Sequence, residues 1–345
     1  MARFGGDVFL IATLRQSGLF LRFMIHNIQA LRALAAMLVV LVHLNPLLPW
    51  PAPDWGVDLF FVLSGFIMVI AATHLGPALF AGKRIARIVP LYWLVTLFTV
   101  VCAVVLPTYF QNTTANLADI TRSLLFIPFT KDGLELRPIL YVGWTLNYEM
   151  FFYALFAVGL ALRRPVIFST ISIVALVSIG IFVPLGTMAS FYTSPLLLQF
   201  AFGMLIGVVY LRRALVLWQA AILAICAITL LSIGHAFPAH RAFSYGLPAA
   251  ALIYAAASLE AHGWRQRGLS ALGDASYALY LTHAFIAGAA LSISAFVPAY
   301  LLVPGAVIAS CLVALLTYRF VERPLNQIAW LEFARKLSPR TGMPA

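Results

Sequence analysis

Charged side chains are scarce in this sequence of 345 residues. Asp, Glu, Lys and Arg make up 10% of it, whereas 63% of its residues are apolar. A soluble globular domain carries about a quarter charged residues, and disordered chains are poor in apolar ones. The composition excludes both classes and predicts a protein that crosses a membrane several times.

Cysteine is also scarce. Cys102, Cys226 and Cys311 lie singly in apolar stretches, without a CxxC pair or a histidine at metal-ligand spacing. A zinc site or a disulfide framework needs such groupings. We therefore expect unreactive buried thiols and no bound metal.

Acidic residues are few as well, with 11 Asp and Glu against 22 Lys and Arg, a formal charge of +11. A basic chain binds nucleic acid when its cations form one water-facing patch. Here they come in small groups between apolar runs, so no nucleic-acid partner is expected. Lys and Arg are retained in cytoplasmic loops, and the grouping predicts that both termini are cytoplasmic.

Apolar runs long enough to cross a membrane fill most of the chain. About 20 residues span the hydrocarbon layer, and the uncharged stretch between Arg164 and Arg212 has room for two crossings. The predicted fold class is an all-α integral membrane bundle of about ten transmembrane helices. The predicted spans are 28–48, 55–74, 88–106, 141–162, 166–184, 195–211, 214–233, 242–259, 276–294 and 299–318.

The spans divide the chain into three parts. Residues 1–27 form a cytoplasmic N-terminal segment, which is dispensable if translation starts at Met24 rather than Met1. Residues 28–318 form one membrane domain. Residues 319–345 form a cytoplasmic tail, too short for a further domain.

Ionisable residues within spans are the candidates for function, because each costs about 2.5–3.5 kcal/mol to insert. Arg32 and His43 lie eleven positions apart, close to three helical turns, so they share one face roughly 16 Å apart. Asp58 begins the second span and Glu149 lies two turns into the fourth. A carboxylate beside His43 would fix its tautomer for general-base catalysis, although Asp58 also suits a helix N-terminus.

Three cations precede the third predicted span. Arg84 and Arg87 stand three positions apart, so on a helix they project from one face, and guanidinium groups bind phosphate through paired hydrogen bonds. Arg32 and His283 are candidates to extend this basic path inward. The alternative is that Lys83, Arg84 and Arg87 only anchor the membrane edge.

The order of these residues resembles the membrane acyltransferase-3 family. Arg32 and His43 match its Arg-x10-His pattern, and Arg84 and Arg87 match its Arg-x-x-Arg pattern. Glu149, in GWTLNYEMFFY, corresponds to the carboxylate of a fourth motif. The form of that motif is similar to the succinoglycan-type exopolysaccharide acetyltransferases.

The resemblance extends from residue 28 to 325 and implies a function. The family acylates glycan hydroxyl groups, with an acyl-CoA donor on the cytoplasmic side. It therefore implies acetyl-CoA as the acyl-donor co-substrate and a glycan acceptor. By similarity, Arg32, Arg84 and Arg87 bind the CoA phosphates, and His43 lies near the thioester.

The sequence thus predicts an O-acyltransferase of the bacterial inner membrane. It would move an acetyl or other short acyl group to a cell-surface or exopolysaccharide glycan. His43 is the expected general base, oriented by Glu149 or Asp58, and an acyl group resting on His43 or Ser64 is the covalent variant. Gln199 stands where relatives often have Glu, so no acid is expected there.

An alternative from another class is a proton-coupled exporter that uses Arg32, His43, Asp58 and Glu149 as a relay. Inverted repeats would favour it, and the sequence has no convincing internal symmetry. The sequence leaves open the acceptor sugar and whether the glycan is lipid-linked. It also leaves open whether the protein is a monomer or a homo-oligomer.

Overall fold

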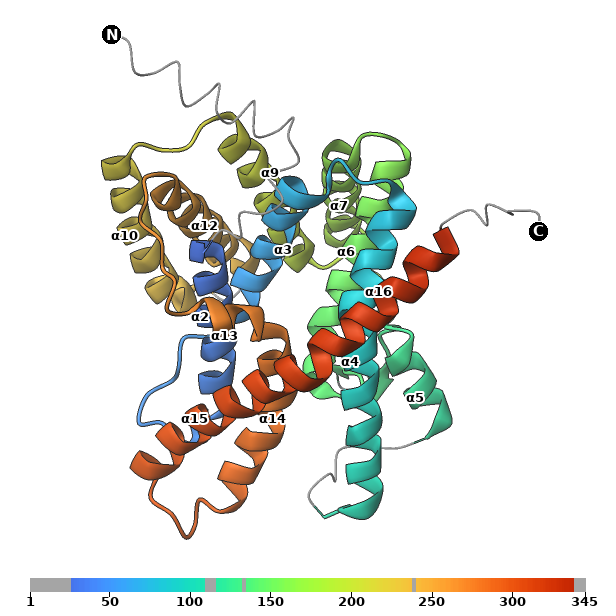
Figure 1. Cartoon of the computed structure of the whole chain (residues 1–345), viewed down its shortest axis with the longest axis vertical. Helices are drawn as coiled ribbons and strands as arrows, with labels where there is room; N and C mark the ends of the chain where they lie inside the picture. The colour runs from blue at the N-terminus through green and yellow to red at the C-terminus, as the bar shows by residue number, and fades with distance from the viewer. Residues whose placement is uncertain (1–25, 109–115, 132–134, 238–239, 338–345) are drawn as a thin grey trace, which may run out of the picture.

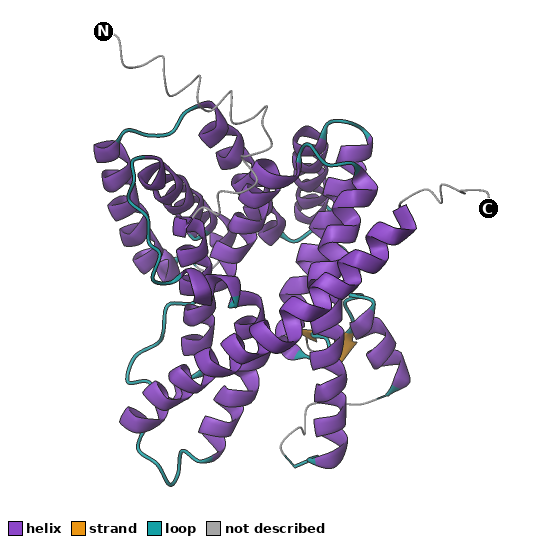
Figure 2. Cartoon of the chain, in the orientation of Figure 1, coloured by secondary structure: helices purple, strands orange, loops and turns teal. Residues whose placement is uncertain are grey.

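The computed structural model describes residues 26–108, 116–131, 135–237 and 240–337, and these are mostly helical (Figures 1 and 2). The long helices are α2 (His26–His43), α3 (Gly56–Ala72), α4 (Pro77–Val105), α6 (Trp144–Ala161), α7 (Pro165–Phe182), α9 (Leu198–Arg212), α10 (Leu217–Ile233), α12 (Gly246–Ala261), α14 (Ser276–Ser292), α15 (Ala299–Thr317) and α16 (Arg323–Leu337). The short helices are α5 (Leu117–Leu124), α8 (Thr187–Tyr192), α11 (Arg241–Ser244) and α13 (Ser270–Asp274).

Tighter and wider helical turns connect these elements. A π-helical segment, η7 (Tyr318–Glu322), joins α15 to α16. Two-residue strands β1 (Thr130–Lys131) and β2 (Glu135–Leu136) pair antiparallel, with Thr130 opposite Leu136. The 3-10 turns are η2 (Asn45–Leu47), η3 (Tyr141–Gly143), η4 (Pro195–Leu197) and η5 (Gly234–Ala236).

The helices account for the predicted membrane spans. Each predicted span overlaps one long helix. Among the described residues, seven helical stretches are long and apolar enough to cross a membrane, and α3 is a shorter apolar helix. The chain is therefore a multi-pass membrane protein, as predicted. Ten crossings and cytoplasmic termini stay predictions, as does the division into three parts. Residues 1–25 lie outside the described residues.

Successive connections lie at alternate ends of the bundle. In Figure 1 the connections α3–α4, α6–α7 and α9–α10 lie at the upper end, whereas α2–α3 and α14–α15 are joined at the lower end. The pairs Arg163–Arg164 and Arg212–Arg213 belong to upper connections. The charge alternation along the sequence is thus reproduced in space, and the upper end is the one predicted to be cytoplasmic.

The start of α2 is fixed to the end of α12. The backbone N–H groups of His26 and Asn27 donate to the Glu260 carboxylate, at 2.9 and 2.8 Å. First-turn N–H groups have no partner within their helix, and a negative charge there suits the helix dipole. The Asn27 amide also donates to the carbonyls of Ala256 and Trp264, at 2.9 and 2.7 Å. These bonds hold the first turn of the helix that carries Arg32 and His43.

Helices α3 and α9 cross closely through glycine. A Cβ at Gly65 would collide with the Phe200 carbonyl, and one at Gly203 would collide with the Val62 carbonyl. Small residues at such crossings let two helix backbones approach each other within a membrane. The crossing fixes the position of Ser64, the neighbour of Gly65.

Aromatic packing places α6 against the same pair of helices. The Phe152 ring stacks on Phe200, with centroids 4.5 Å apart, and Phe200 packs on Phe61 at 4.7 Å. Both Phe152 and Phe200 are fully buried. Offset ring pairs add to the energy of burial. This contact brings Glu149 on α6 to the face of α3 that carries Ser64.

Candidate active site

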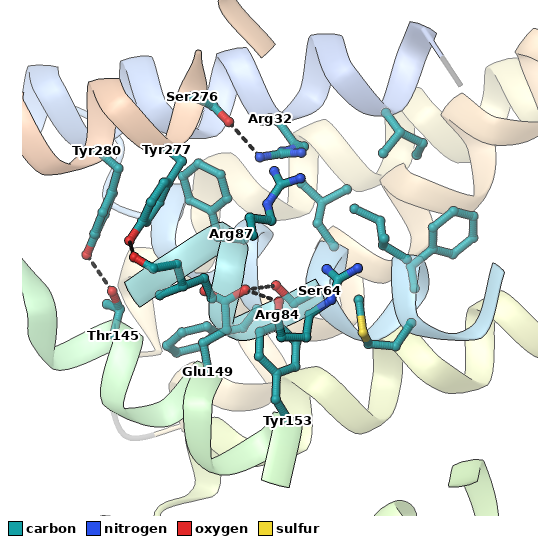
Figure 3. Close-up of a pocket in the computed structure, with 18 of the residues that line it drawn as sticks. Arg32, Ser64, Arg84, Arg87, Thr145, Glu149, Tyr153, Ser276, Tyr277 and Tyr280 are labelled. Carbon is teal, nitrogen blue, oxygen red and sulfur yellow. Dashed lines mark hydrogen bonds between the residues drawn. The ribbon is translucent and has the colours of Figure 1, made fainter. Parts of the chain in front are cut away.

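A cavity of about 500 Å³ lies among α2, α3, α4, α6, α13 and α14 (Figure 3). Arg32 of α2, Ser64 of α3, Arg84 and Arg87 of α4, and Glu149 of α6 line it. Helix α4 begins at Pro77, well before the predicted span, so both arginines lie within a helix and face the cavity. The other polar residues of the lining are Gln29, Thr145, Tyr153, Asp274, Ser276, Tyr277 and Tyr280.

The three arginines of the lining, here called the cavity arginines, form no salt bridge with a carboxylate in the described part of the chain, although Glu149 and Asp274 line the same cavity. Arg32 donates to the Ser276 hydroxyl at 3.0 Å, and its guanidinium lies beside that of Arg87 (Figure 3). The buried Nε of Arg84 has no hydrogen-bond partner among the described residues. Within the same residues, Arg87 makes no hydrogen bond or ion pair. Three guanidinium groups with hydrogen-bond donors still available can bind a polyanion.

Glu149 is held by two hydroxyl groups. Ser64 donates to its Oε1 at 2.9 Å, and Tyr153 donates to the same oxygen at 2.5 Å (Figure 3). Tyr153 is one turn further along α6, and its ring also lies 5.6 Å from the guanidinium carbon of Arg84. The structure therefore places Glu149 in the cavity wall, where it is hydrogen-bonded to Ser64 and Tyr153 rather than to His43.

His43 contacts a second histidine. Its Nδ1 lies 2.9 Å from the Val39 carbonyl and 3.3 Å from Nε2 of His283. The Nδ1 of His283 lies 3.1 Å from the Leu279 carbonyl. These contacts are satisfied together when each histidine carries its proton on Nδ1. The Nε2 of His43 then has a free lone pair, the form that a general base needs.

The two histidines correct one expectation about the basic path. His283 was predicted to extend the arginine cluster, but the structure places it fully buried against His43. Arg32 and His43 both face α14, since Arg32 reaches Ser276 and His43 reaches His283. The prediction that they share one helix face is confirmed.

Tyr280 stands between the cavity and the histidine pair. It lines the cavity, and its ring centroid lies 5.9 Å from that of His283. Its hydroxyl donates to the Val142 carbonyl at 2.8 Å and lies 2.7 Å from the Thr145 hydroxyl. Tyr280 thus separates the cavity from the histidine pair, and neither His43 nor His283 belongs to the lining of the cavity.

Asp58 lies in a separate group, here called the Arg241 cluster, that comprises Asp54, Asp58, Gln199, Arg241 and Tyr245. Arg241 contacts Asp58 and Asp54, each at 2.6 Å. The Gln199 amide also donates to Asp58 at 2.6 Å. The expectation that Asp58 orients His43 is not met, because its oxygens are bonded to Arg241 and Gln199. The sequence marked Gln199 only as a position where relatives often have Glu. In the structure, its amide donates to the Asp58 carboxylate.

Two carboxyl groups outside the spans have shifted pKa values. Partial burial acts to raise the pKa of Asp54, but hydrogen bonds from Tyr245 and Arg241 outweigh it and lower that pKa below its usual range. Burial raises the pKa of Asp274 at the end of α13, and the nearby charge of Arg32 opposes that rise. Asp54 is therefore held as the anion, whereas Asp274 accepts a proton more readily than an exposed aspartate does.

Sequence reasoning missed Tyr153, Tyr280 and Arg241. The two tyrosines had a detectable signal, because Tyr153 follows Glu149 by four positions and Tyr280 precedes His283 by three. Arg241 had none, since it lies 183 positions from Asp58. His, Cys, Asp and Glu side chains form no cluster of three that could hold a metal, as far as the described residues go, and the absence of a metal stays a prediction.

Comparisons with known proteins agree with this arrangement of residues. The acyltransferase domain of the acyltransferase-3 family matches residues 25–319. The chain is 37% identical over 285 residues to the exopolysaccharide production protein ExoZ of Rhizobium meliloti (strain 1021), covering 78% of this chain and 88% of that protein. No solved structure matches the chain. The match across most of the chain, together with the cavity arginines, shows that this protein belongs to the acyltransferase-3 family.

Proposed function

We propose that this protein is a membrane O-acyltransferase acting on exopolysaccharide, with acetyl-CoA or another short acyl-CoA as donor. The observation that carries the proposal is the cavity inside the helical bundle, with three arginines on its wall. An acyl-CoA presents several phosphate charges and a slender arm that ends in a thioester. Guanidinium groups that form no salt bridge with the described residues, in a partly buried cavity, suit those phosphates.

The donor would lie with its phosphates at the cavity arginines and its arm directed toward Tyr280. Arg32 and Arg87 lie beside each other and suit the pyrophosphate, while Arg84 lies nearer Ser64 (Figure 3). The cavity continues past Thr145 to Tyr280. The thioester would then lie at Tyr280, whose side chain separates the cavity from His43 and His283, so transfer requires the Tyr280 ring to move aside.

His43 is the proposed general base. Its Nε2 takes the proton of a sugar hydroxyl while that oxygen attacks the thioester carbonyl, so that a C–O bond forms and the C–S bond breaks. The imidazolium then returns the proton to the leaving thiolate. The Val39 carbonyl and Nε2 of His283 both face Nδ1 of His43, and these two acceptors favour the positive charge during the transfer.

The acceptor glycan would reach His43 from the end of the bundle predicted to be extracytoplasmic. The Tyr141 ring lies 6.2 Å from the His43 ring, and Tyr141 is 41% exposed. An exposed aromatic ring beside the base suits the apolar face of a sugar. A location in the bacterial inner membrane, with a cytoplasmic donor and a glycan acceptor outside, is part of this proposal, and the similarity to an exopolysaccharide production protein supports the glycan acceptor.

The exporter alternative has less support from the structure. Its relay would need Arg32, His43, Asp58 and Glu149 to follow one another along one path. Instead, Asp58 is engaged by Arg241, and Glu149 accepts hydrogen bonds from Ser64 and Tyr153. This separation favours the acyltransferase.

A transfer assay tests the proposal. Protein in nanodiscs receives labelled acetyl-CoA and a panel of exopolysaccharides, and label on the glycan is counted. Replacing a general base costs about 10²- to 10⁴-fold in rate, so we expect His43→Gln to lose that much. The matched control is His235→Gln, because His235 is exposed and bonds only the Ser232 carbonyl in the described chain. Full transfer by His43→Gln would contradict the base assignment.

The same assay separates direct transfer from an acyl-enzyme. Enzyme mixed with labelled acetyl-CoA in the absence of glycan is denatured at once and tested for protein-bound label. Direct transfer predicts none. Label that disappears in Ser64→Ala would instead identify an acylated serine.

A further inference from the structure

A second cavity of about 310 Å³ continues from the first. The two cavities share Gln29, Arg32, Arg87 and Asp274, so they form one path past the arginines. Gln29, Asp274 and Arg323 come from helix ends on the side predicted to be cytoplasmic. The second cavity, here called the α16 pocket, is therefore the inner mouth of the path.

Helix α16 supplies the outer wall of this pocket. Arg323, Asn326, Gln327 and Trp330 line it, and their spacing of three and four positions puts them on one helix face. The family match ends at residue 319, so these four residues lie beyond it. The predicted tail is thus, in part, a helix that closes a cavity.

Two features hold α16 over the mouth. The π-helical segment Tyr318–Glu322 adds a wide turn before α16, and such turns are frequent at functional sites. Gly82 of α4 leaves room for the Phe333 ring, because any Cβ there would collide with it. Helix α16 therefore crosses α4 closely, as Figure 1 shows. The Lys83 amine lies 5.6 Å from the Trp330 ring centroid.

The α16 pocket contains polar groups that lack a partner. The Glu322 side chain is 2% exposed, and its Oε2 has no hydrogen-bond partner among the described residues. The same holds for Oδ1 of Asn326. Buried polar atoms of this kind are costly unless a ligand or water satisfies them. The pocket thus combines a tryptophan, an amide, carboxylates and cations.

We propose that the α16 pocket binds the 3′-phosphoadenosine end of the acyl-CoA donor. Trp330 offers a stacking surface for adenine, and Asn326 offers an amide to the edge of the base. Arg323 suits the ribose 3′-phosphate, and Glu322 suits the remaining ribose hydroxyl. This assignment rests on the proposed acyltransferase function and extends its donor site beyond the three cavity arginines.

A series of three ligands distinguishes the contribution of the α16 pocket to binding from that of the cavity arginines. Full-length protein in neutral-lipid nanodiscs is titrated with CoA, dephospho-CoA and 4′-phosphopantetheine. Loss of a stacked base costs about tenfold or more in affinity. We expect Trp330→Ala to weaken CoA about tenfold and to leave 4′-phosphopantetheine, which has no nucleotide, unchanged. Trp264→Ala is the matched control, because that ring is 67% exposed and lies outside the pocket.

A second variant keeps the test valid if Trp330→Ala does not fold. Arg323 is exposed, and we expect Arg323→Gln to abolish the preference for CoA over dephospho-CoA, which lacks the 3′-phosphate. Equal weakening of CoA and 4′-phosphopantetheine by Trp330→Ala, or an unchanged preference in Arg323→Gln, would overturn the proposal. If wild-type protein binds 4′-phosphopantetheine but gains nothing from the nucleotide, only the α16 pocket assignment fails. If it binds none of the three, the acyl-CoA function fails with it.

Discussion

The Arg241 cluster and the cavity arginines are two polar groups in the same apolar bundle, and they differ in how their charges are balanced. In the Arg241 cluster, one guanidinium bonds Asp54 and Asp58, and Gln199 and Tyr245 donate to the same two carboxylates. Every charge in that group faces an opposite charge within 2.6 Å. No capacity for a ligand is evident in such a network, and its function is to join α3 to α11 and α12.

The cavity arginines have the opposite balance. Arg32, Arg84 and Arg87 meet no carboxylate in an ion pair within the described chain, and Glu149 is bonded to hydroxyl groups instead. Glu149, Asp274 and Glu322 line the same two cavities, but like charges held near one another without a direct ion pair still destabilise a fold. In the proposed function, the phosphates of the donor supply further negative charge to these arginines. The two groups thus differ in direct ion pairing more than in depth in the membrane.

We expect the largest loss of stability on replacement of Arg241. Replacing it by Met leaves Asp58, which is 1% exposed, without its cation. Breaking a buried ion pair costs about 3–5 kcal/mol, and we expect about 3 kcal/mol because Gln199 still donates to Asp58. The measurement is thermal unfolding in detergent. Arg87→Met is the control and should unfold at no lower temperature than wild type. Equal losses of stability in both variants would show that the two groups of charges do not differ in their contribution to the fold.

The second prediction concerns donor binding. Hydrogen bonds to charged groups contribute about 1.5–3 kcal/mol, so Arg84→Gln or Arg87→Gln should weaken CoA binding about 10- to 100-fold. The free energy of unfolding should stay within about 0.5 kcal/mol of wild type. Calorimetric titration measures the affinity. Wild-type affinity in both variants would mean that the arginines only mark the membrane edge.

A smaller effect is expected at Tyr153. Tyr153→Phe removes one of two hydroxyl donors to Glu149 while keeping the ring beside Arg84. We expect the transfer rate to fall about tenfold and CoA affinity to stay unchanged, since the arginines are intact. Rate and affinity are measured on the same preparation. A matched loss of affinity would show that Glu149 serves donor binding instead.

The smallest effect is the pH dependence of the Arg241 cluster. The pKa of Asp54 is lowered in the folded protein, so its anion contributes stability above the ordinary value of 3.8. That contribution is lost as the pH falls from 3.8 through the lower folded pKa. The difference in melting temperature between wild type and Asp54→Asn should therefore narrow as the pH falls below 3.8. Parallel curves would contradict the assigned pairing.

The sequence predicted those features that depend on local spacing. Three helical turns between Arg32 and His43 put both on the face toward α14, and Arg84 and Arg87 project together into the cavity. The contact of Glu149 with Tyr153 follows the same spacing rule and was open to prediction.

The partners of Asp58 and His283 depend on which distant helices meet. Asp58 and His43 were predicted at a similar depth, but depth does not specify direction around a helix axis. The closely packed glycines of α3 and α9 turn Asp58 toward Gln199 and Arg241. Similarly, α14 carries both Ser276 and His283, so one helix contacts Arg32 near its start and the proposed base, His43, two turns later.

The most direct test is a cryo-electron microscopy map of the protein in nanodiscs with a non-hydrolysable acetyl-CoA analogue. We expect density that begins in the α16 pocket, passes between Arg32 and Arg87 with the pyrophosphate, and ends beside Tyr280. An empty cavity with the analogue bound elsewhere, or a lipid chain between the arginines, would contradict it.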